Sequence, residues 1–146
     1  MIRPAILDDH DAIRLCAEAA YARYVPLIGR RPAPMDADYR GLIAQGRALV
    51  ACDPAVLGFV TFWPKSDHMY LDALAVMPDA AGRGLGRALV ERVEQAACAV
   101  GLGEVRLYTN AAMAENLTLY PHLGYRLVER RVDDGFDRVF FTKRLA

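Results

Sequence analysis

The sequence predicts one α/β (α+β) domain with a mixed, mostly antiparallel sheet of about seven strands, flanked by about four helices. Its 146 residues suffice for one sizeable core. A hydrophobic fraction of 54% and a charged fraction of 25% are typical of soluble globular domains. Stretches with helical periodicity alternate with runs rich in β-branched and aromatic residues. No repeat or long linker divides the chain, so we treat residues 1–146 as a single domain.

The first third of the chain predicts a short strand and two helices. Residues 2–7 favour the opening strand. Asp8 or Asp9 is a suitable N-cap for a helix whose apolar residues recur at helical spacing and which ends near Pro26. A second helix is expected within residues 35–45.

The middle of the chain predicts an antiparallel meander followed by a crossover helix. Three β-rich runs are separated by turn signals: residues 48–52, 56–63 and 69–76. The strongest helical pattern covers residues 84–100, and a strand follows at 104–109. A strand, helix and strand in this order favour a right-handed parallel connection between residues 69–76 and 104–109.

The last third predicts a short helix around residues 113–120 and a C-terminal hairpin. The hairpin strands are expected at 125–132 and 138–143, with Asp133-Asp134-Gly135 as the turn.

Charge and cysteine content exclude several function classes. Eighteen Lys and Arg balance eighteen Asp and Glu, so no global field attracts nucleic acid or anionic lipid. No apolar run at the N-terminus is long enough for a signal peptide or a membrane span. We therefore predict a cytoplasmic protein with no nucleic-acid and no membrane partner. The three cysteines lack metal-ligand spacing, and we predict no metal site.

A glycine-rich segment joins the strand at 69–76 to the strongest helix. Glycines leave backbone N–H groups accessible to an anion, and the helix N-terminus adds partial positive charge. A pyrophosphate would fit there, with two arginines at its rim. The alternative is a tight turn whose glycines serve packing alone. The glycines are Gly82, Gly84 and Gly86, and the arginines are Arg83 and Arg87.

Two common nucleotide-binding motifs do not match this segment. A dinucleotide fingerprint needs glycine at the third position after Gly84, and Arg87 stands there. A Walker-type loop needs Gly-Lys-Ser or Gly-Lys-Thr, and the chain contains neither triplet.

The chain resembles the GNAT superfamily of acetyl-CoA-dependent N-acetyltransferases in two motifs that occur in the family's order. They are Leu74-Ala75-Val76-Met77-Pro78 with Arg83-Gly84-Leu85-Gly86, and Tyr120-Pro121-His122-Leu123-Gly124-Tyr125. Together with the predicted strand order, the resemblance covers nearly the whole chain. It implies a GNAT-like fold and acetyl-CoA as co-substrate.

The resemblance also implies roles for individual residues. The backbone of Leu74, Ala75 and Val76 would pair with the pantetheine arm of the cofactor, and an N–H near Val76 would stabilise the oxyanion. The segment Gly82, Arg83, Gly84, Leu85, Gly86 and Arg87 would wrap the pyrophosphate. Tyr120 would be the general acid, which suits a phenol with a pKa of about 10. The structural alternative for Tyr120 is a core aromatic.

The chain departs from the family's pattern at two positions. Ala81 stands where the family usually has Gln or Arg, which puts one phosphate contact in doubt. Met113 stands where the family often has Asn, and Asn116, on the same helical face as Tyr120, becomes the candidate pantetheine contact. Pro121 is expected to kink or end its helix.

The base that deprotonates the amine has two side-chain candidates. Asp72 lies in phase with Leu74 and Val76 on a predicted strand, from which it could accept a proton directly or through water. The alternative is a surface carboxylate paired with an arginine. His68 is a second candidate.

The acceptor site is expected near the Pro-rich loop, where the resemblance places the acceptor-binding wall. Tyr24, Arg30 and Arg31 are the candidates there, and the arginines would suit an acceptor with a carboxylate or phosphate. Solvated arginines are the alternative.

The predicted function is transfer of the acetyl group of acetyl-CoA to a primary amine of a small molecule or peptide, by direct attack in a ternary complex. The alternative function is a non-catalytic acyl-CoA-binding sensor or regulatory module. The sequence leaves open whether the chain forms a homodimer.

Overall fold

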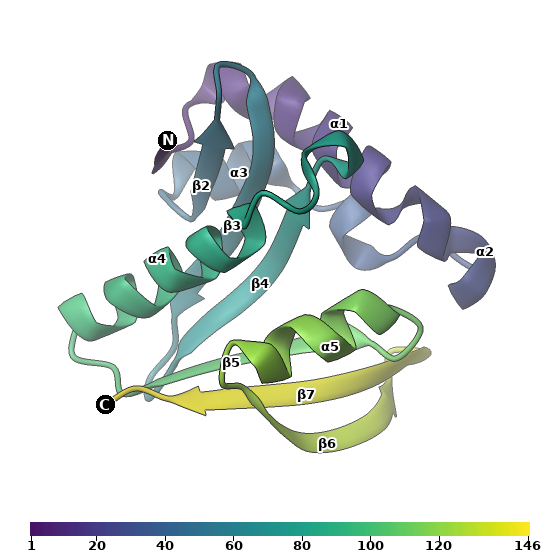
Figure 1. Cartoon of the computed structure of the whole chain (residues 1–146), viewed down its shortest axis with the longest axis vertical. Coiled ribbons are helices and arrows are strands. Elements are labelled where there is room, and N and C mark those ends of the chain that lie inside the picture. The colour runs from purple at the N-terminus through teal and green to yellow at the C-terminus, as the bar shows by residue number, and fades with distance from the viewer.

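A seven-stranded sheet organises the chain, and the computed structural model describes all 146 residues (Figure 1). The strand order is β1-β2-β3-β4-β5-β7-β6. Every neighbouring pair is antiparallel except β4 with β5. The strands are β1 (Ile2–Pro4), β2 (Ala48–Cys52), β3 (Val56–Pro64), β4 (Met69–Val76), β5 (Glu104–Asn110), β6 (Arg126–Asp133) and β7 (Phe136–Arg144).

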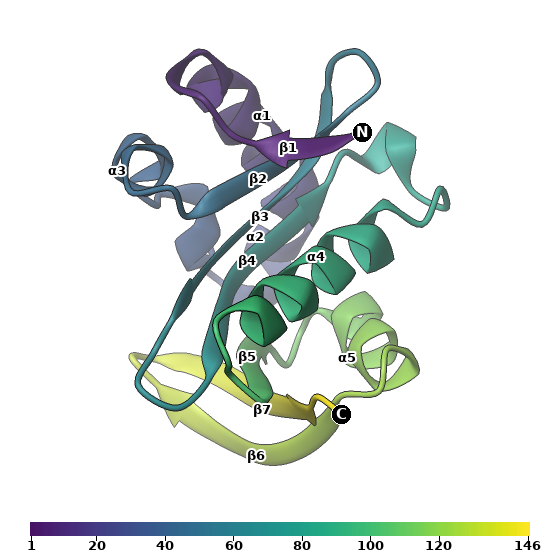
Figure 2. The same cartoon turned by 90° about the vertical axis from the view of Figure 1, so that its left-hand side faces the viewer.

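Helices cover both faces of the sheet. Figure 2 shows α1 to α3 on one side and α4 with α5 on the other. The predicted fold class is thereby confirmed, including the parallel return from β4 through α4 to β5. The helices are α1 (His10–Tyr21), α2 (Val25–Ile28), α3 (Tyr39–Ala44), α4 (Leu85–Ala99) and α5 (Ala114–His122).

Each face of the sheet has its own hydrophobic cluster. Beneath α1 and α3, Ile13, Tyr39 and Phe59 are almost completely buried. Beneath α4 and α5, Leu89 and Phe141 are equally buried. Because each such side chain contributes about 1.5–3 kcal/mol when removed from water, the two clusters hold the helices against the sheet.

The first helix differs from its prediction at the C-terminal end. It ends at Tyr21, and a 3₁₀ turn leads directly into the one-turn helix α2. Pro26 lies in the first turn of α2, where a backbone N–H has no helical acceptor and its absence costs little. Pro26 therefore begins a helical turn and does not end one.

Asp9 is not the side-chain cap of α1 that the sequence suggested. Its carboxylate accepts two hydrogen bonds from the Arg3 guanidinium, at 2.8 and 2.9 Å, and one from the Ile6 N–H at 2.8 Å. These contacts fix the start of α1 against β1. The hydrogen bond from Arg3 is the main reason that the pKa of Asp9 is lowered.

Replacement of Asp9 by asparagine is expected to lower the free energy of unfolding at pH 7 by about 1 kcal/mol, because it removes the charged partner of Arg3. The loss is no larger because Arg3 is one-third exposed and solvent weakens the pair. Since the folded pKa lies below the unfolded one, this contribution is complete above about pH 4 and is lost as the pH falls through the folded pKa. Urea unfolding at several pH values measures whether the free energies of unfolding of the wild type and Asp9→Asn become equal at low pH. Asp8→Asn, at an exposed neighbouring position, is the control.

The sheet splits between β4 and β5. These strands pair only at Met69 with Val105 and Tyr70 with Arg106, whereas β5 stays paired with β7 along its whole length. Beyond residue 70, one edge of β4 therefore has no neighbouring strand. The opening between the two strands positions the candidate site.

Candidate functional site

A groove of about 870 Å³ runs along the free edge of β4 between α5 and the N-terminus of α4. It is lined by nine of the ten residues predicted to bind the cofactor: Leu74, Ala75, Val76, Gly82, Gly84, Leu85, Gly86, Arg87 and Asn116. The tenth, Arg83, is exposed and is not part of the groove wall. Ala81 also lines the groove. Its short side chain therefore lies where the resemblance led us to expect a phosphate contact from Gln or Arg.

The loop before α4 contains two residues with positive φ angles, a conformation that glycine adopts without strain. Gly82 and Gly84 have φ angles of +84° and +76°, and no atom would crowd a Cβ at either position. Backbone conformation and not packing therefore requires these glycines. This observation argues against the packing alternative for the glycine-rich segment.

Six consecutive backbone N–H groups, those of residues 82–87, donate to no acceptor in the chain. The next N–H, that of Ala88, donates to the Gly84 carbonyl and begins the helical pattern. Unpaired N–H groups at the start of a 15-residue helix carry partial positive charge, which favours a negatively charged ligand. Arg87 adds a full positive charge to the same wall.

The free edge of β4 presents polar backbone groups to the groove. The Met77 N–H donates to the Leu57 carbonyl of β3 at 2.7 Å. Because successive residues of an antiparallel strand point their N–H groups to opposite sides, those of Val76 and Leu74 face away from β3 toward the opening. Tyr21 of α1 donates its hydroxyl hydrogen to the Leu74 carbonyl at 2.7 Å.

A second cavity of about 120 Å³ lies beyond the groove, between β4 and the ends of β5 and β7. Tyr21, Leu74 and Asn116 line both cavities and therefore mark their junction. Tyr120 and Asp72, the two predicted catalytic residues, both line the second cavity. The structure thus brings together two side chains separated by 48 positions in the sequence.

Tyr120 is 3% exposed, and its ring packs against the rings of Tyr125 and Phe141. Its hydroxyl donates to no group of the chain. Burial raises its pKa, so the phenol stays protonated at neutral pH. A protonated hydroxyl without an internal acceptor is available to donate to a ligand. Pro121 follows within α5, which ends one residue later at His122, close to the predicted end.

Asp72 occupies a β-bulge. Thr61 of β3 lies opposite Ala73 and Phe62 lies opposite Leu71, so Asp72 is the extra residue on β4. Its carboxylate accepts a hydrogen bond of 2.9 Å from the Thr61 hydroxyl. Burial is the largest influence on Asp72 and raises its pKa, whereas the Thr61 hydrogen bond opposes that rise.

The bulge corrects one inference from the sequence. We expected Asp72 to share a face with Leu74 and Val76, but Leu74 packs toward α4. Asp72 is bonded to Thr61, which lies two residues after Phe59 on β3 and therefore on the same face as Phe59, toward α1. The extra residue breaks the two-residue period, which turns Asp72 out of phase. His68 pairs with Asp67 at 2.7 Å in the β3–β4 turn and lines neither cavity.

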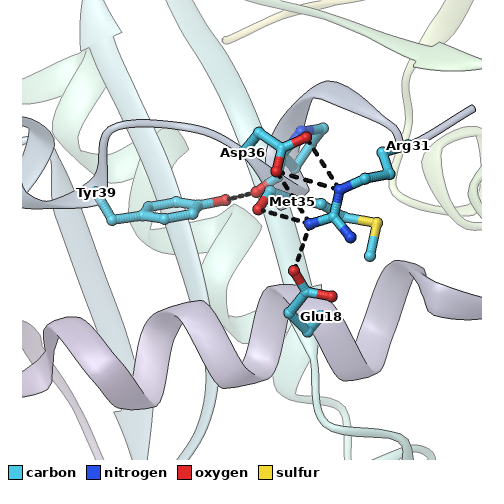
Figure 3. Close-up of polar contacts among 6 residues, drawn as sticks. Glu18, Arg31, Met35, Asp36 and Tyr39 are labelled. Carbon is cyan, nitrogen blue, oxygen red and sulfur yellow. Dashed lines mark hydrogen bonds and ion pairs between the residues drawn. The ribbon is translucent and has the colours of Figure 1, made fainter.

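The three candidates for acceptor binding are placed differently. Tyr24 lines the groove and accepts a hydrogen bond from Arg23. Arg30 stacks on the ring of Phe136, with 3.7 Å between its Cζ and the ring centroid. Arg31 donates to Glu18 of α1 at 2.5 Å and to Asp36 (Figure 3). Neither arginine lines the small cavity; both fasten the loop that covers it.

Several residues of the small cavity have no counterpart among the sequence predictions. They lie on β5 and β7, and their convergence depends on the split between β4 and β5, which no local motif reveals. They include Tyr108, Phe136 and Arg138.

The family model described as the Acetyltransferase (GNAT) family matches residues 13–125 of the chain. The chain belongs to this GNAT acetyltransferase family. The match contains both motifs on which the resemblance was based, together with the groove and most of the small cavity. No curated protein matches this GNAT chain in sequence.

Solved structures support the same fold. The PaiA N-acetyltransferase from Thermoplasma acidophilum, in complex with coenzyme A, has a TM-score of 0.82 at 17% identity, over 99% of this chain and 98% of its own. The ribosomal-protein-S18-alanine N-acetyltransferase from Escherichia coli has a TM-score of 0.77 at 20% identity, over 100% and 94%. YncA from Salmonella typhimurium, a putative acetyltransferase with its cofactor acetyl-CoA, has a TM-score of 0.74 at 22% identity, over 100% and 94%.

Two further properties of the GNAT chain concern membranes and metals. None of its helices has both the length and the apolar character needed to cross a membrane. No group of three or more His, Cys, Asp or Glu side chains is placed to hold a metal ion.

Proposed function

We propose that this GNAT protein transfers the acetyl group of acetyl-CoA to a primary amine by direct attack in a ternary complex. The observation that carries the proposal is the run of six unpaired N–H groups in a groove that adjoins the small cavity lined by Tyr120 and Asp72. An anion site and an acid–base pair joined by one groove suit a long, phosphorylated acyl donor.

The groove has the donors that coenzyme A requires. The N–H groups of residues 82–87 and the Arg87 guanidinium would hold the diphosphate. The free backbone edge at Leu74 and Val76 would pair with the amides of the pantetheine arm, beside Asn116. The Asn116 amide already donates to Thr109 at 3.0 Å, which leaves its carbonyl oxygen for the ligand. Acetyl-CoA supplies a reactive thioester at the end of this arm.

The side chains of the small cavity would supply the proton transfers. Asp72 accepts a proton from the ammonium group of the acceptor, directly or through water, so that the neutral amine can form the new C–N bond. The N–H of Leu74, at the junction of the two cavities, donates to the acyl oxygen as it gains negative charge, and the Val76 N–H and the carbonyl groups of both residues remain for the pantetheine amides. Tyr120 donates its proton to the sulfur as the C–S bond breaks, and the second proton of the amine nitrogen passes to the Tyr120 oxygen, directly or through water. The products are an acetamide, free CoA and the proton held by Asp72, which is released to solvent.

Calorimetric titration of CoA tests the cofactor assignment. Arg87→Gln is expected to weaken CoA binding about 10- to 100-fold, because it removes a charged hydrogen-bond donor from the groove wall. Arg92→Gln makes the same charge change on α4 outside the groove and should leave the affinity unchanged. Wild-type protein that binds neither CoA nor acetyl-CoA would contradict the proposal.

Turnover is tested by the release of free thiol from acetyl-CoA in the presence of a panel of amines. Amine-dependent release identifies a transferase. Binding of acetyl-CoA without release on any amine would instead support the sensor alternative.

A further inference from the structure

The small cavity has one acidic and one basic side chain in its wall. Asp72 comes from β4, and Arg138 comes from β7. All other lining residues are uncharged. The two charged residues belong to the two halves of the split sheet, since β7 pairs with β5 and not with β4. A ligand in the cavity therefore meets an acidic side chain from one half of the sheet and a basic side chain from the other.

Arg138 is well buried but has few partners. Its side chain is 12% exposed, and its guanidinium lies 4.3 Å from the Tyr108 ring centroid and 5.1 Å from that of Phe136. One N–H, on Nη1, donates to the Asp133 carboxylate at 3.0 Å, an ion pair in which the Asp133 side chain is 45% exposed. A guanidinium has five N–H donors, so four have no acceptor within the chain. A buried charged donor gains most from an anionic acceptor.

Asp72 is the complementary case. Its carboxylate accepts one hydrogen bond, from Thr61, and no Lys or Arg lies within ion-pair distance of it. Lys65 is the only cation whose charge acts on it appreciably, and Lys65 lies over the Tyr70 ring. An ammonium group in the cavity would give this carboxylate the partner that the chain does not provide.

We propose that the amine acceptor is a compact amino acid, whose ammonium group lies toward Asp72 and whose carboxylate lies against Arg138. This inference rests on the proposed function and names the substrate class of the same site. A polyamine or the amine of a long peptide would leave the Arg138 donors unpaired. The cavity volume of about 120 Å³ favours a small side chain, since an engineered cavity of about 150 Å³ holds benzene.

The covering loop supports the same size limit. Pro32, Ala33, Pro34 and Ala37 form part of the cavity wall. The contacts of Arg31 with Glu18 and Asp36 hold this loop in place (Figure 3). The stacking of Arg30 on Phe136 holds it as well. The cavity thus has walls from this loop and from both halves of the split sheet.

The test compares free amino acids with their C-terminal amides, which keep the amine and lose the carboxylate. For the wild type, the amide is expected to have a KM about 10- to 100-fold higher. Arg138→Gln should raise the KM of the amino acid by a similar factor and leave that of the amide unchanged. Arg138→Lys, which keeps the charge, should partly restore the amino-acid KM. Arg126→Gln on β6, exposed and outside both cavities, is the control for charge.

The outcomes separate this inference from the proposed function. The inference is overturned, and the proposed transferase function stands, if the protein acetylates polyamines or peptides but no free amino acid. The amino acids tested range in size from glycine to phenylalanine and include β-alanine. If no amine releases thiol, the proposed function fails, and titration of amino acids into the CoA complex decides the inference. Saturable binding that Arg138→Gln abolishes supports it; no binding by any amino acid overturns it. The comparison of acid with amide in wild-type protein requires no variant to fold.

Discussion

Replacement of Tyr120 by phenylalanine is expected to lower kcat for acetyl transfer about 10²- to 10⁴-fold, which is the usual contribution of a positioned general acid. The variant removes one oxygen from a ring that is held by Tyr125 and Phe141, so the packing of the cavity should persist. The affinity for acetyl-CoA should stay within about twofold, because the groove wall does not include Tyr120. Steady-state kinetics and calorimetry measure the two quantities separately.

Tyr125→Phe is the matched control for this prediction. Tyr125 lies in the same aromatic cluster, but its hydroxyl donates to Glu94 at 2.9 Å and it lines neither cavity. This variant should lose about 1 kcal/mol of stability with the hydrogen bond and keep its turnover. If Tyr120→Phe turned over as fast as the wild type, Tyr120 would be a core aromatic and not the acid.

Replacement of Asp72 by asparagine is expected to lower kcat/KM about 10²- to 10⁴-fold, because asparagine cannot accept the amine's proton. The carboxylate is the active form, so wild-type kcat/KM should fall as the pH drops through the pKa of Asp72. Burial raises that pKa, and the acid limb should therefore lie above the value of about 3.9 for an ordinary aspartate. This limb should be absent from the pH profile of Asp72→Asn.

Thr61→Val sharpens the assignment of the base. The Thr61 hydroxyl stabilises the carboxylate form of Asp72, so its removal should move the acid limb to higher pH while the plateau rate is largely kept. Identical pH profiles for wild type, Thr61→Val and Asp72→Asn would assign the base role to water or to another group.

The ionised Asp72 carboxylate, which should increase turnover, should decrease the free energy of unfolding. Because its folded pKa is raised, the folded state binds more protons than the unfolded state as the pH passes from the unfolded to the folded pKa. The free energy of unfolding then decreases with rising pH in that window. Asp72→Asn is therefore expected to unfold at a higher urea concentration than the wild type at neutral pH, even though its turnover is lower.

The regular elements could be predicted because local patterns specify them. The strands at 48–52 and 69–76 have the predicted bounds, and α4 lies within the predicted 84–100. Alternation of apolar residues, turn residues and a strong helical period act over short distances along the chain. The glycine loop was predictable for the same reason, since its conformation and its helix are consecutive in sequence.

The small cavity could not be predicted because it depends on contacts between distant segments. The bulge at Asp72 adds one residue to a strand that is otherwise apolar or aromatic at every position, so no change of sequence pattern marks it. Arg138 appeared to be an ordinary hairpin residue, and its role depends on where β7 lies relative to β4. Arg30 and Arg31 occupy the expected loop, but their partners Phe136 and Glu18 are not neighbours in sequence.

The two-pair junction between β4 and β5 has a consequence for how this protein can diversify. The strand whose free edge lines the groove, β4, is anchored to β3, whereas the strand that carries Phe136 and Arg138 is anchored to β5 and β6. Substitutions on β7 can therefore change which amine is selected without disturbing the register that presents β4 to the acyl donor. Selection of new acceptors and retention of a common donor become separable traits of one small domain.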